Sequence, residues 1–196
     1  MSERQIYVEG GGNRTELKSR RRQAFSKLFA KAGLEKRMPH FVPSGGREQT
    51  FDKFRNAHSI SDSGDFIAML IDSEFPVADP EKPWDHLKKH DNWDKPANAI
   101  DEQVLFMTTS METWIAADRT ALKSHYGQKL NENALPPLEH LENRSRDEVL
   151  KRLSNAAPYA KGKQSFEVLQ TLNPATLNTL PAFARAIRIL KARLLQ

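Results

Sequence analysis

The chain has 196 residues, of which 38% are hydrophobic and 28% charged, as is typical of a folded globular domain rather than a disordered one. It contains no cysteine, which excludes disulfides, thiolate metal sites and a cysteine nucleophile. The net charge of +5 favours a polyanionic partner. No signal-peptide core and no apolar run of membrane-spanning length is found, so we expect a cytoplasmic protein.

The first predicted strand, residues 6–8, ends in Glu9 and leads into a tight turn before a helix. The turn consists of three glycines, Gly10, Gly11 and Gly12. Glycines at this point allow the backbone to approach a phosphate, and the start of the following helix favours an anion. An acid at the carboxyl end of a parallel strand lies where α/β proteins bind their ligands. Glu9 is therefore expected to face a charged ligand or a metal.

The helix that follows carries apolar residues at helical spacing and is predicted to stop at Gly33. Three of its basic residues are candidate nucleic-acid contacts: Lys18, Arg21 and Arg22. A solvated helix face explains the same charges equally well. A second strand at residues 40–42 then turns into a helix that starts near Arg47. This arginine could reach a phosphate, or it could lie exposed on a structural turn.

A continuous apolar run at residues 66–71 predicts a central parallel strand that is buried on both faces. The run ends in Asp72, and Glu74 follows two residues later. Residues i and i+2 of a strand point to the same side. Asp72 and Glu74 are therefore expected to aim at one point.

Residues 75–99 form a long polar segment, which inside a compact domain is usually functional or mobile. Trp84 and Trp93 could stack on bases, but the burial of such side chains more often anchors a loop to the body of the protein. His86 and His90 stand four apart in a short helical stretch. This is the spacing of a zinc-binding pair, although surface histidines are the default interpretation.

Residues 102–108 are the fourth predicted strand, and Ser110 caps the helix after it. Glu112 begins this helix on the same crevice edge as Glu9, which makes it the candidate for an additional metal ligand. Asp118 falls on the apolar side of the same helix. A carboxylate in that position is costly unless it bonds to backbone, pairs with an arginine or binds a metal.

Beyond Tyr126 the pattern becomes irregular and then helical, with a basic loop between helices that contains Lys161 and Lys163. Lys163 is a further candidate nucleic-acid contact. We expect an α/β core at residues 1–126 and a C-terminal helical extension at residues 127–196 packed on that core. The predicted fold class is α/β, a mainly parallel central sheet of about four strands flanked by helices.

Two signatures resemble those of the Toprim fold, the metal-binding Rossmann-like α/β domain of topoisomerases, primases and OLD-type nucleases. They are Glu9-Gly10 after one strand and Asp72-x-Glu74 after a later one. Most Toprim domains have Asp-x-Asp as the second signature, so Glu74 departs from the pattern while keeping an oxygen ligand. Toprim nucleases of the OLD type use a lysine near the metals. The match at Lys161-Gly162 makes Lys161 the corresponding candidate.

A broader set of motifs resembles the bacterial "domain of unknown function 4276". The matching segments are Ile6 to Gly12, Gly45 to Arg47, Ile71 to Glu74, Trp93 to Pro96, Met111 to Asp118, Asn131 to Pro136 and Lys161-Gly162. That family is regarded as Toprim-like and often occurs in anti-phage defence neighbourhoods. The resemblance implies a defence effector whose sensing partner is an ATPase.

Glu9, Asp72 and Glu74 together predict a site for Mg²⁺ or Mn²⁺, because crowded carboxylates repel one another and a hard cation relieves the repulsion. The expected activity is metal-dependent hydrolysis of DNA or RNA phosphodiesters, with Lys161 or Arg47 neutralising charge on the leaving side. The alternative is a catalytically inactive Toprim-like module that binds nucleic acid or a partner ATPase. A dinucleotide-binding enzyme is poorly supported, because the turn lacks the third glycine of that fingerprint. Assembly into a homo-oligomer stays open.

Overall fold

The computed structural model of the chain describes residues 3–10 and 15–195. Its centre is a four-stranded sheet in the order β2-β1-β3-β4, in which every neighbouring pair is parallel. The strands are β1 (Arg4–Glu9), β2 (His40–Gly45), β3 (Phe66–Asp72) and β4 (Val104–Met107). The predicted α/β fold with a parallel sheet is therefore confirmed.

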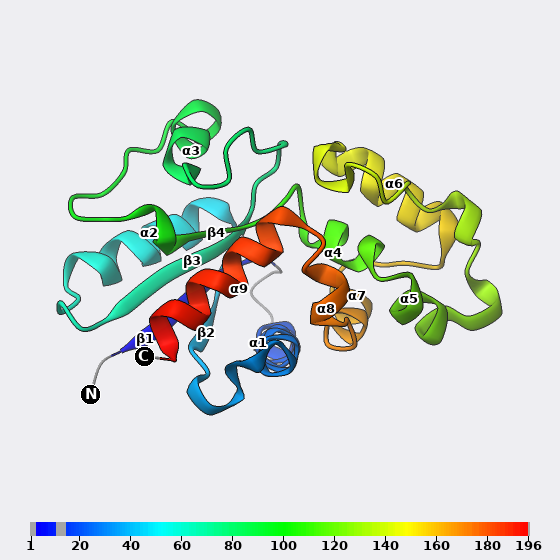
Figure 1. Cartoon of the computed structure of the whole chain (residues 1–196), viewed down its shortest axis with the longest axis horizontal. Coiled ribbons are helices and arrows are strands. Elements are labelled where there is room, and N and C mark those ends of the chain that lie inside the picture. The colour runs from blue at the N-terminus through cyan, green and yellow to red at the C-terminus, as the bar shows by residue number, and fades with distance from the viewer. Residues whose placement is uncertain (1–2, 11–14, 196) are drawn as a thin grey trace.

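Helices cover both faces of the sheet, and the C-terminal helices α5 to α8 gather on the right in Figure 1. The α-helices of the described chain are α1 (Thr15–Phe29), α2 (Arg47–Ser59), α3 (Pro83–Asp91), α4 (Met111–Ala117), α5 (Arg119–Tyr126), α6 (Arg146–Ala156), α7 (Lys163–Leu169), α8 (Pro174–Leu177) and α9 (Pro181–Leu194). The predicted C-terminal helical region is present. Within the described chain, we find no helix with the length and apolar character that a membrane span requires.

Strand β3 is buried on both faces, as its apolar sequence predicts. Ile67, Met69 and Ile71 belong to a hydrophobic cluster with residues of α2 and α3. Ala68 and Leu70 belong to a second, larger cluster with residues of α1, α4 and α9. The alternation of side chains along a strand thus supplies both layers of the core from one segment.

The polar segment after β3 is anchored to the sheet by its two tryptophans. Trp84 and Trp93 are 4% and 6% exposed, so neither ring is available to stack on a base. The ring of Trp93 stacks on Phe51 of α2 with centroids 4.2 Å apart, and Trp84 Nε1 donates to the carbonyl of Ile100 at 3.2 Å. Burial of aromatic area is the anchoring role that the sequence also allowed.

The helix predicted to carry both Glu112 and Asp118 is in fact broken between them. Helix α4 ends at Ala117, and Asp118 caps α5 by accepting from the backbone N–H of Ala121 at 3.0 Å. Its second oxygen accepts from the N–H of Asn173 at 2.7 Å. The buried Asp118 is therefore bonded to backbone, and its carboxylate ends one helix and begins the next.

Strand β4 is shorter than the predicted 102–108, because residues 101–103 form a turn of 3₁₀-helix instead. The side chain of Gln103 determines this start. Its amide nitrogen donates to the carbonyl of Ile67 at 2.9 Å, and its amide oxygen accepts from the N–H of Ile100 at 2.9 Å. A side chain thus replaces the ladder hydrogen bonds that a longer strand would have made.

The C-terminal helices share the core of the sheet. Phe183 of α9 lies edge-on to Trp114 of α4, with centroids 5.0 Å apart, and stacks on Phe29 of α1 at 6.2 Å. All three side chains are fully buried in the larger cluster. Elements from the beginning, middle and end of the chain therefore meet in one hydrophobic cluster.

Glu142 ties the irregular segment before α6 to the start of α9. Its two carboxylate oxygens lie 3.1 and 3.2 Å from the backbone N–H nitrogen of Ala182, which donates to them. Burial raises the pKa of Glu142 from 4.5 to about 7, against the opposing effect of this hydrogen bond. The folded protein thus holds the proton more tightly than the unfolded chain does. The stabilisation is complete below pH 4.5 and is lost as the pH rises through about 7.

We expect Glu142→Gln to remove this pH dependence, because the glutamine oxygen still accepts from Ala182 but carries no charge. Above pH 7 the variant should be more stable than the wild type, by on the order of 1–3 kcal/mol. Thermal unfolding across the acidic and neutral range measures the difference. Glu139→Gln, which neutralises an exposed carboxylate in the same segment, is the control. A stability difference that does not change with pH would contradict the assignment.

Candidate active site

The order of the strands creates a switch point between β1 and β3. From β1 the chain crosses to β2 on one side, and β3 and β4 follow on the other side. Ligands of open α/β sheets bind at such a point, outside the carboxyl ends of the strands. Glu9 ends β1 and Asp72 ends β3, and the backbone N–H of Asp72 donates to Glu9 Oε2 at 3.1 Å. The two predicted carboxylates therefore lie side by side at this point.

A cavity of about 220 Å³ opens at the same edge of the sheet. It is lined by acidic and basic side chains together, which are Glu9, Asp72, Glu112, Arg21, Arg146 and Lys161. Gly10, Met107, Met111, Gly162, Ser165 and Phe166 complete the wall. The structure thus brings together six residues that the sequence singled out from distant segments: Glu9, Gly10, Arg21, Asp72, Glu112 and Lys161.

The two strand-end carboxylates are held by backbone donors and are poorly solvated. Asp72 Oδ1 accepts from the N–H of Met111, the first residue of α4, at 2.9 Å. Burial raises the pKa of Asp72 well above its ordinary value, and the charges of Glu9 and Glu112 raise it further. Burial also raises the pKa of Glu9, with Arg47 opposing this effect. The site therefore favours a proton or a cation between these groups.

Arg47 lies on the other side of Glu9, where it fastens β1 to α3. Its Nε donates to Asp91 Oδ1 at 2.6 Å, and its NH1 lies 3.3 Å from Glu9 Oε2. The guanidinium packs over the ring of Trp93 at 5.1 Å and is largely buried. The expectation of an exposed arginine on a turn is wrong, because a carboxylate from α3 reaches across to pair with it. Its contact with phosphate stays a prediction.

Glu74 does not point in the direction expected from strand alternation. Strand β3 ends at Asp72, and Glu74 has a left-handed backbone with φ of 63°. Its N–H donates at 3.0 Å to the carbonyl of Thr109, which lies beyond the end of β4. The carboxylate of Glu74 instead pairs with Arg146 of α6. The shared aim of Asp72 and Glu74 is therefore not observed, although the charge of Glu74 still raises the pKa of Asp72.

Lys161 is positioned at the cavity by a buried carboxylate. Glu112 is 3% exposed, and its Oε1 accepts from the hydroxyl of Tyr159 at 3.0 Å. The ammonium of Lys161 lies 3.6 Å from the same oxygen, while almost half of the lysine side chain is exposed. The ammonium of Lys161 is thus held beside Glu112 in the cavity wall, while part of the side chain stays exposed to a ligand.

Two residues of the site escaped the sequence analysis. No pattern in the sequence pointed to Tyr159, since a single tyrosine between two helices is most often part of the hydrophobic core. A pattern did point to Arg146, because it is a cation in the first turn of α6, where the helix macrodipole disfavours positive charge. Its pairing with Glu74 compensates for that position.

The fit of a metal ion can be judged from the donor set. Among residues 3–10 and 15–195, no three side chains of the His, Asp and Glu types are grouped to hold a metal. The carboxylate oxygens of Glu9 and Asp72 are nevertheless the ligand type that Mg²⁺ prefers. Mg²⁺ usually takes one or two protein carboxylates and completes its shell with water and substrate phosphate. Glu9 and Asp72 fit this mode, and they are the residues that would hold the ion.

A family model described as "Domain of unknown function (DUF4276)" matches residues 8–191. The chain belongs to this family. The resemblance expected from the sequence motifs is therefore confirmed, and the DUF4276 match includes every candidate residue from Glu9 to Lys163. No curated protein and no solved structure matches the chain significantly.

The basic residues predicted to contact nucleic acid are dispersed in this DUF4276 member. Lys18 is half-buried, Lys163 is exposed at the start of α7, and Arg22 donates to the carbonyl of Phe41 at 3.2 Å. Arg21, in contrast, is 1% exposed, so it cannot belong to an outer basic face. The reason is the helical period, which turns Arg21 toward the cavity while its neighbours face outward.

The glycine turn is described in part. Gly10 has φ of 116°, a value that favours glycine, and its N–H donates to the carbonyl of Gly45 at 2.7 Å. Gly11 and Gly12, the other predicted phosphate contacts, lie outside the described residues.

The rings of His86 and His90 lie against each other with centroids 4.5 Å apart, and each histidine also has a partner outside the pair. His86 is buried, and its Nε2 lies 2.9 Å from the carbonyl oxygen of Ser73. His90 stacks on Phe75 with centroids 4.5 Å apart. His86 is therefore not the surface histidine that the default interpretation expected. It packs between α3 and the end of β3.

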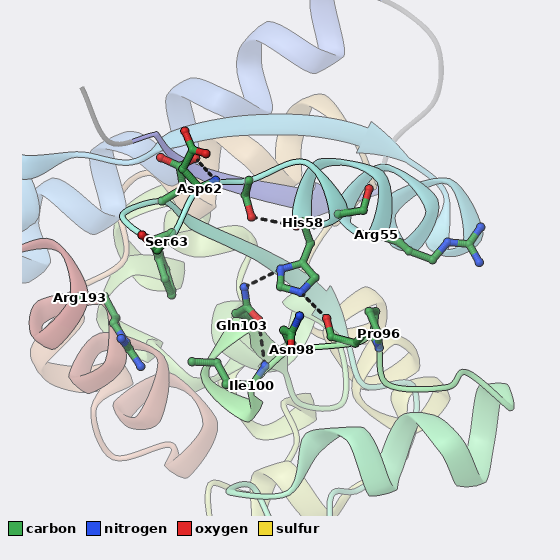
Figure 2. Close-up of a pocket in the computed structure, with 14 residues that line it drawn as sticks. Arg55, His58, Asp62, Ser63, Pro96, Asn98, Ile100, Gln103 and Arg193 are labelled. Atoms are coloured by element: carbon green, nitrogen blue, oxygen red, sulfur yellow. Dashed lines mark hydrogen bonds between the residues drawn. The ribbon is translucent and has the colours of Figure 1, made fainter.

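A larger pocket, of about 790 Å³, lies near the starts of β3 and β4, at the opposite edge of the sheet. Figure 2 shows His58 directed at Gln103 in this pocket, with Nδ1 3.2 Å from the amide nitrogen. The other ring nitrogen lies 3.1 Å from the carbonyl oxygen of Ala97. These polar groups satisfy one another, whereas the carboxylates and cations that the sequence singled out line the smaller cavity.

Proposed function

We propose that the chain is a metal-dependent nuclease that cleaves nucleic-acid phosphodiesters, and that its α/β core is of the Toprim type. The observation that carries this proposal is the cavity at the switch point, where carboxylates and cationic side chains line the same space. Carboxylates suit a hard cation, and the cationic groups suit a phosphate. The family resemblance adds the proposal of an anti-phage effector that acts with an ATPase.

In the proposed reaction Glu9 and Asp72 would hold Mg²⁺ or Mn²⁺. When bound, the ion supplies Lewis acidity to the phosphodiester and lowers the pKa of its water. Lys161 lies at the open side of the cavity, where its ammonium neutralises charge that develops on the phosphate oxygens. Glu112 and Tyr159 keep Lys161 in that place. Burial raises the pKa of Glu9, which leaves this carboxylate in need of the charge that a bound cation would supply.

One observation favours the alternative of a binding module without catalysis. Glu9 is paired with Arg47 and Glu74 with Arg146, so arginines already neutralise two of the carboxylates predicted to bind metal. A module of this kind would bind nucleic acid or an ATPase and release no cleavage product. Cleavage assays with Mg²⁺ and Mn²⁺ separate the two proposals.

We expect Lys161→Ala to lower the cleavage rate by about a hundred-fold or more, as the loss of one charge-stabilising donor does in other active sites. The matched control is Lys151→Ala, which removes an exposed lysine of α6 that does not line the cavity. The control should cleave at close to the wild-type rate. The measurement is single-turnover cleavage of labelled DNA and RNA with saturating Mn²⁺.

Equal rates for Lys161→Ala and Lys151→Ala would remove Lys161 from the mechanism. Binding of nucleic acid by the wild type without any product would reject the nuclease and support the binding module. A loss of cleavage in both variants would point to net charge rather than to a positioned lysine.

A further inference from the structure

The side chain of Arg21 is an unusual feature of the cavity wall. It is 1% exposed, and its Nε, NH1 and NH2 have no hydrogen-bond partner among the described residues. A buried charge without acceptors is unfavourable, so such groups are normally paired. Burial lowers the pKa of Arg21 to about 10, which leaves the guanidinium charged at neutral pH. A cation with unused donors therefore faces the cavity.

The surroundings of Arg21 hold the guanidinium in place without satisfying it. Its Cζ lies 5.4 Å from the centroid of the Phe166 ring, which provides an aromatic face but no acceptor. A β-carbon at Gly10 would lie 3.7 Å from the same Cζ, which is an ordinary van der Waals distance, so the end of β1 lies directly beside the guanidinium. Glu9 attracts Arg21 electrostatically, and no hydrogen bond joins them.

The other cations of the site are used differently. Arg47 is bonded to Asp91, and Arg146 to Glu74. Lys161 shares the cavity with Arg21 and is partly open to solvent. A ligand that enters between Lys161 and Arg21 would meet an ammonium at the mouth and an unpaired guanidinium in the wall. The planar fork of a guanidinium matches two oxygens of a phosphate.

We infer that Arg21 forms a phosphate subsite in this cavity, which binds one phosphate group of a nucleic acid with Lys161 at the mouth. The identity of the carrier as nucleic acid rests on the proposed function. The subsite itself rests on Arg21, and it can be tested without any cleavage. In this subsite Arg21 contacts the phosphate inside the cavity and is not a nucleic-acid contact on the outer face of α1.

The test uses inorganic phosphate as the probe, with EDTA present so that no metal contributes. Thermal unfolding and ³¹P line broadening are recorded for the wild type, Arg21→Met and Arg20→Met, each against sodium chloride of equal ionic strength. Arg20 is the matched control, because it is the neighbouring arginine on α1 and its guanidinium pairs with Glu16 at the surface. We expect phosphate to stabilise the wild type and Arg20→Met and to leave Arg21→Met unchanged.

Two outcomes would overturn the inference. One is no response of the wild type to phosphate at tens of times its usual cellular concentration, and the other is an equal response of Arg21→Met. If Arg21→Met does not fold, Arg21→Lys replaces it. Lysine keeps the charge but loses the fork, so phosphate affinity should fall by about tenfold or more. Unchanged affinity in Arg21→Lys would assign Arg21 a purely structural role against Phe166.

The carrier of the phosphate is identified by competition. If a short single-stranded oligonucleotide displaces inorganic phosphate from the wild type, the subsite takes a nucleic-acid phosphate. If only free phosphate or a mononucleotide competes, the carrier is a small molecule and the nucleic-acid part is overturned. Phosphate binding that depends on Arg21, in a protein that cleaves nothing, would retain the subsite and reject the nuclease.

Discussion

Asp72→Asn is expected to abolish binding of Mn²⁺ and Mg²⁺ and to lower any metal-dependent cleavage by about a thousand-fold or more. The loss follows from the position of Asp72 at the end of the central strand beside Glu9, where it is one of two carboxylates suited to the ion. A metal ligand contributes several kcal/mol to stabilisation of the transition state, and each 1.4 kcal/mol is about tenfold in rate. Isothermal titration of Mn²⁺ measures the binding directly.

The same substitution should leave the melting temperature unchanged or raise it. Asparagine keeps an oxygen to accept from the N–H of Met111, and it removes a charge that burial disfavours. The pKa of Asp72 in the folded protein is well above 3.8, so its ionised form opposes folding at neutral pH. The advantage of the variant should therefore disappear below pH 3.8, where the wild-type carboxyl is protonated in both states.

Asp52→Asn is the matched control for this experiment, because Asp52 lies in an exposed ion pair with Arg55 on α2. It should bind Mn²⁺ as the wild type does. Unchanged Mn²⁺ affinity in Asp72→Asn would exclude Asp72 as a ligand. No binding by the wild type would leave a site that substrate completes, and the titration would then be repeated with an uncleavable oligonucleotide.

Phe183→Ala is expected to destabilise the protein by about 3–5 kcal/mol, the usual cost of deleting a buried phenylalanine ring. The ring is fully buried between Trp114 and Phe29, so its removal leaves a cavity among side chains from three helices. For a chain of this length the melting temperature should fall by roughly 6–20 °C. Differential scanning calorimetry gives both this shift and the number of transitions.

A single transition is expected in both proteins, because α9 shares one hydrophobic cluster with the sheet. Leu195→Ala, just beyond the same helix and 45% exposed, is the control and should change stability by less than about 0.5 kcal/mol. Two separate transitions would show that the C-terminal helices fold as an independent unit. An unchanged melting temperature in Phe183→Ala would contradict the packing of α9 on α1 and α4.

Local patterns in the sequence predicted most of the sheet and the two strand-end acids. The positions of Glu9 and Asp72 could be predicted from the sequence, because each follows an apolar run and parallel strands end at a common edge of the sheet. Glu74 was misplaced because alternation applies only while the strand lasts, and β3 ends at Asp72, before the left-handed backbone of Glu74. The sequence had no means of marking that boundary, which depends on backbone hydrogen bonds to β4 and the residues after it.

The positions of the basic residues in the site could not be predicted from the sequence, because they depend on tertiary structure. Arg21 is one of a run of basic residues on α1, and charge alone does not tell which member points inward. Its direction is determined by the packing of α1 against α7, a helix more than a hundred residues later. The pairs of Arg47 with Asp91 and Arg146 with Glu74 likewise join segments far apart in sequence. Such pairs arise from the folded topology, and periodicity carries no information about them.

The cavity wall joins the beginning of the chain to a late segment, since Glu9 and Arg21 meet Lys161 and Phe166 there. A ribosome delivers these segments in order, at roughly 5–20 residues per second. A nascent chain that has released only the first strands would therefore display Glu9 and Asp72 without the lysine or the aromatic wall. The cavity wall is therefore complete only after synthesis has passed α7.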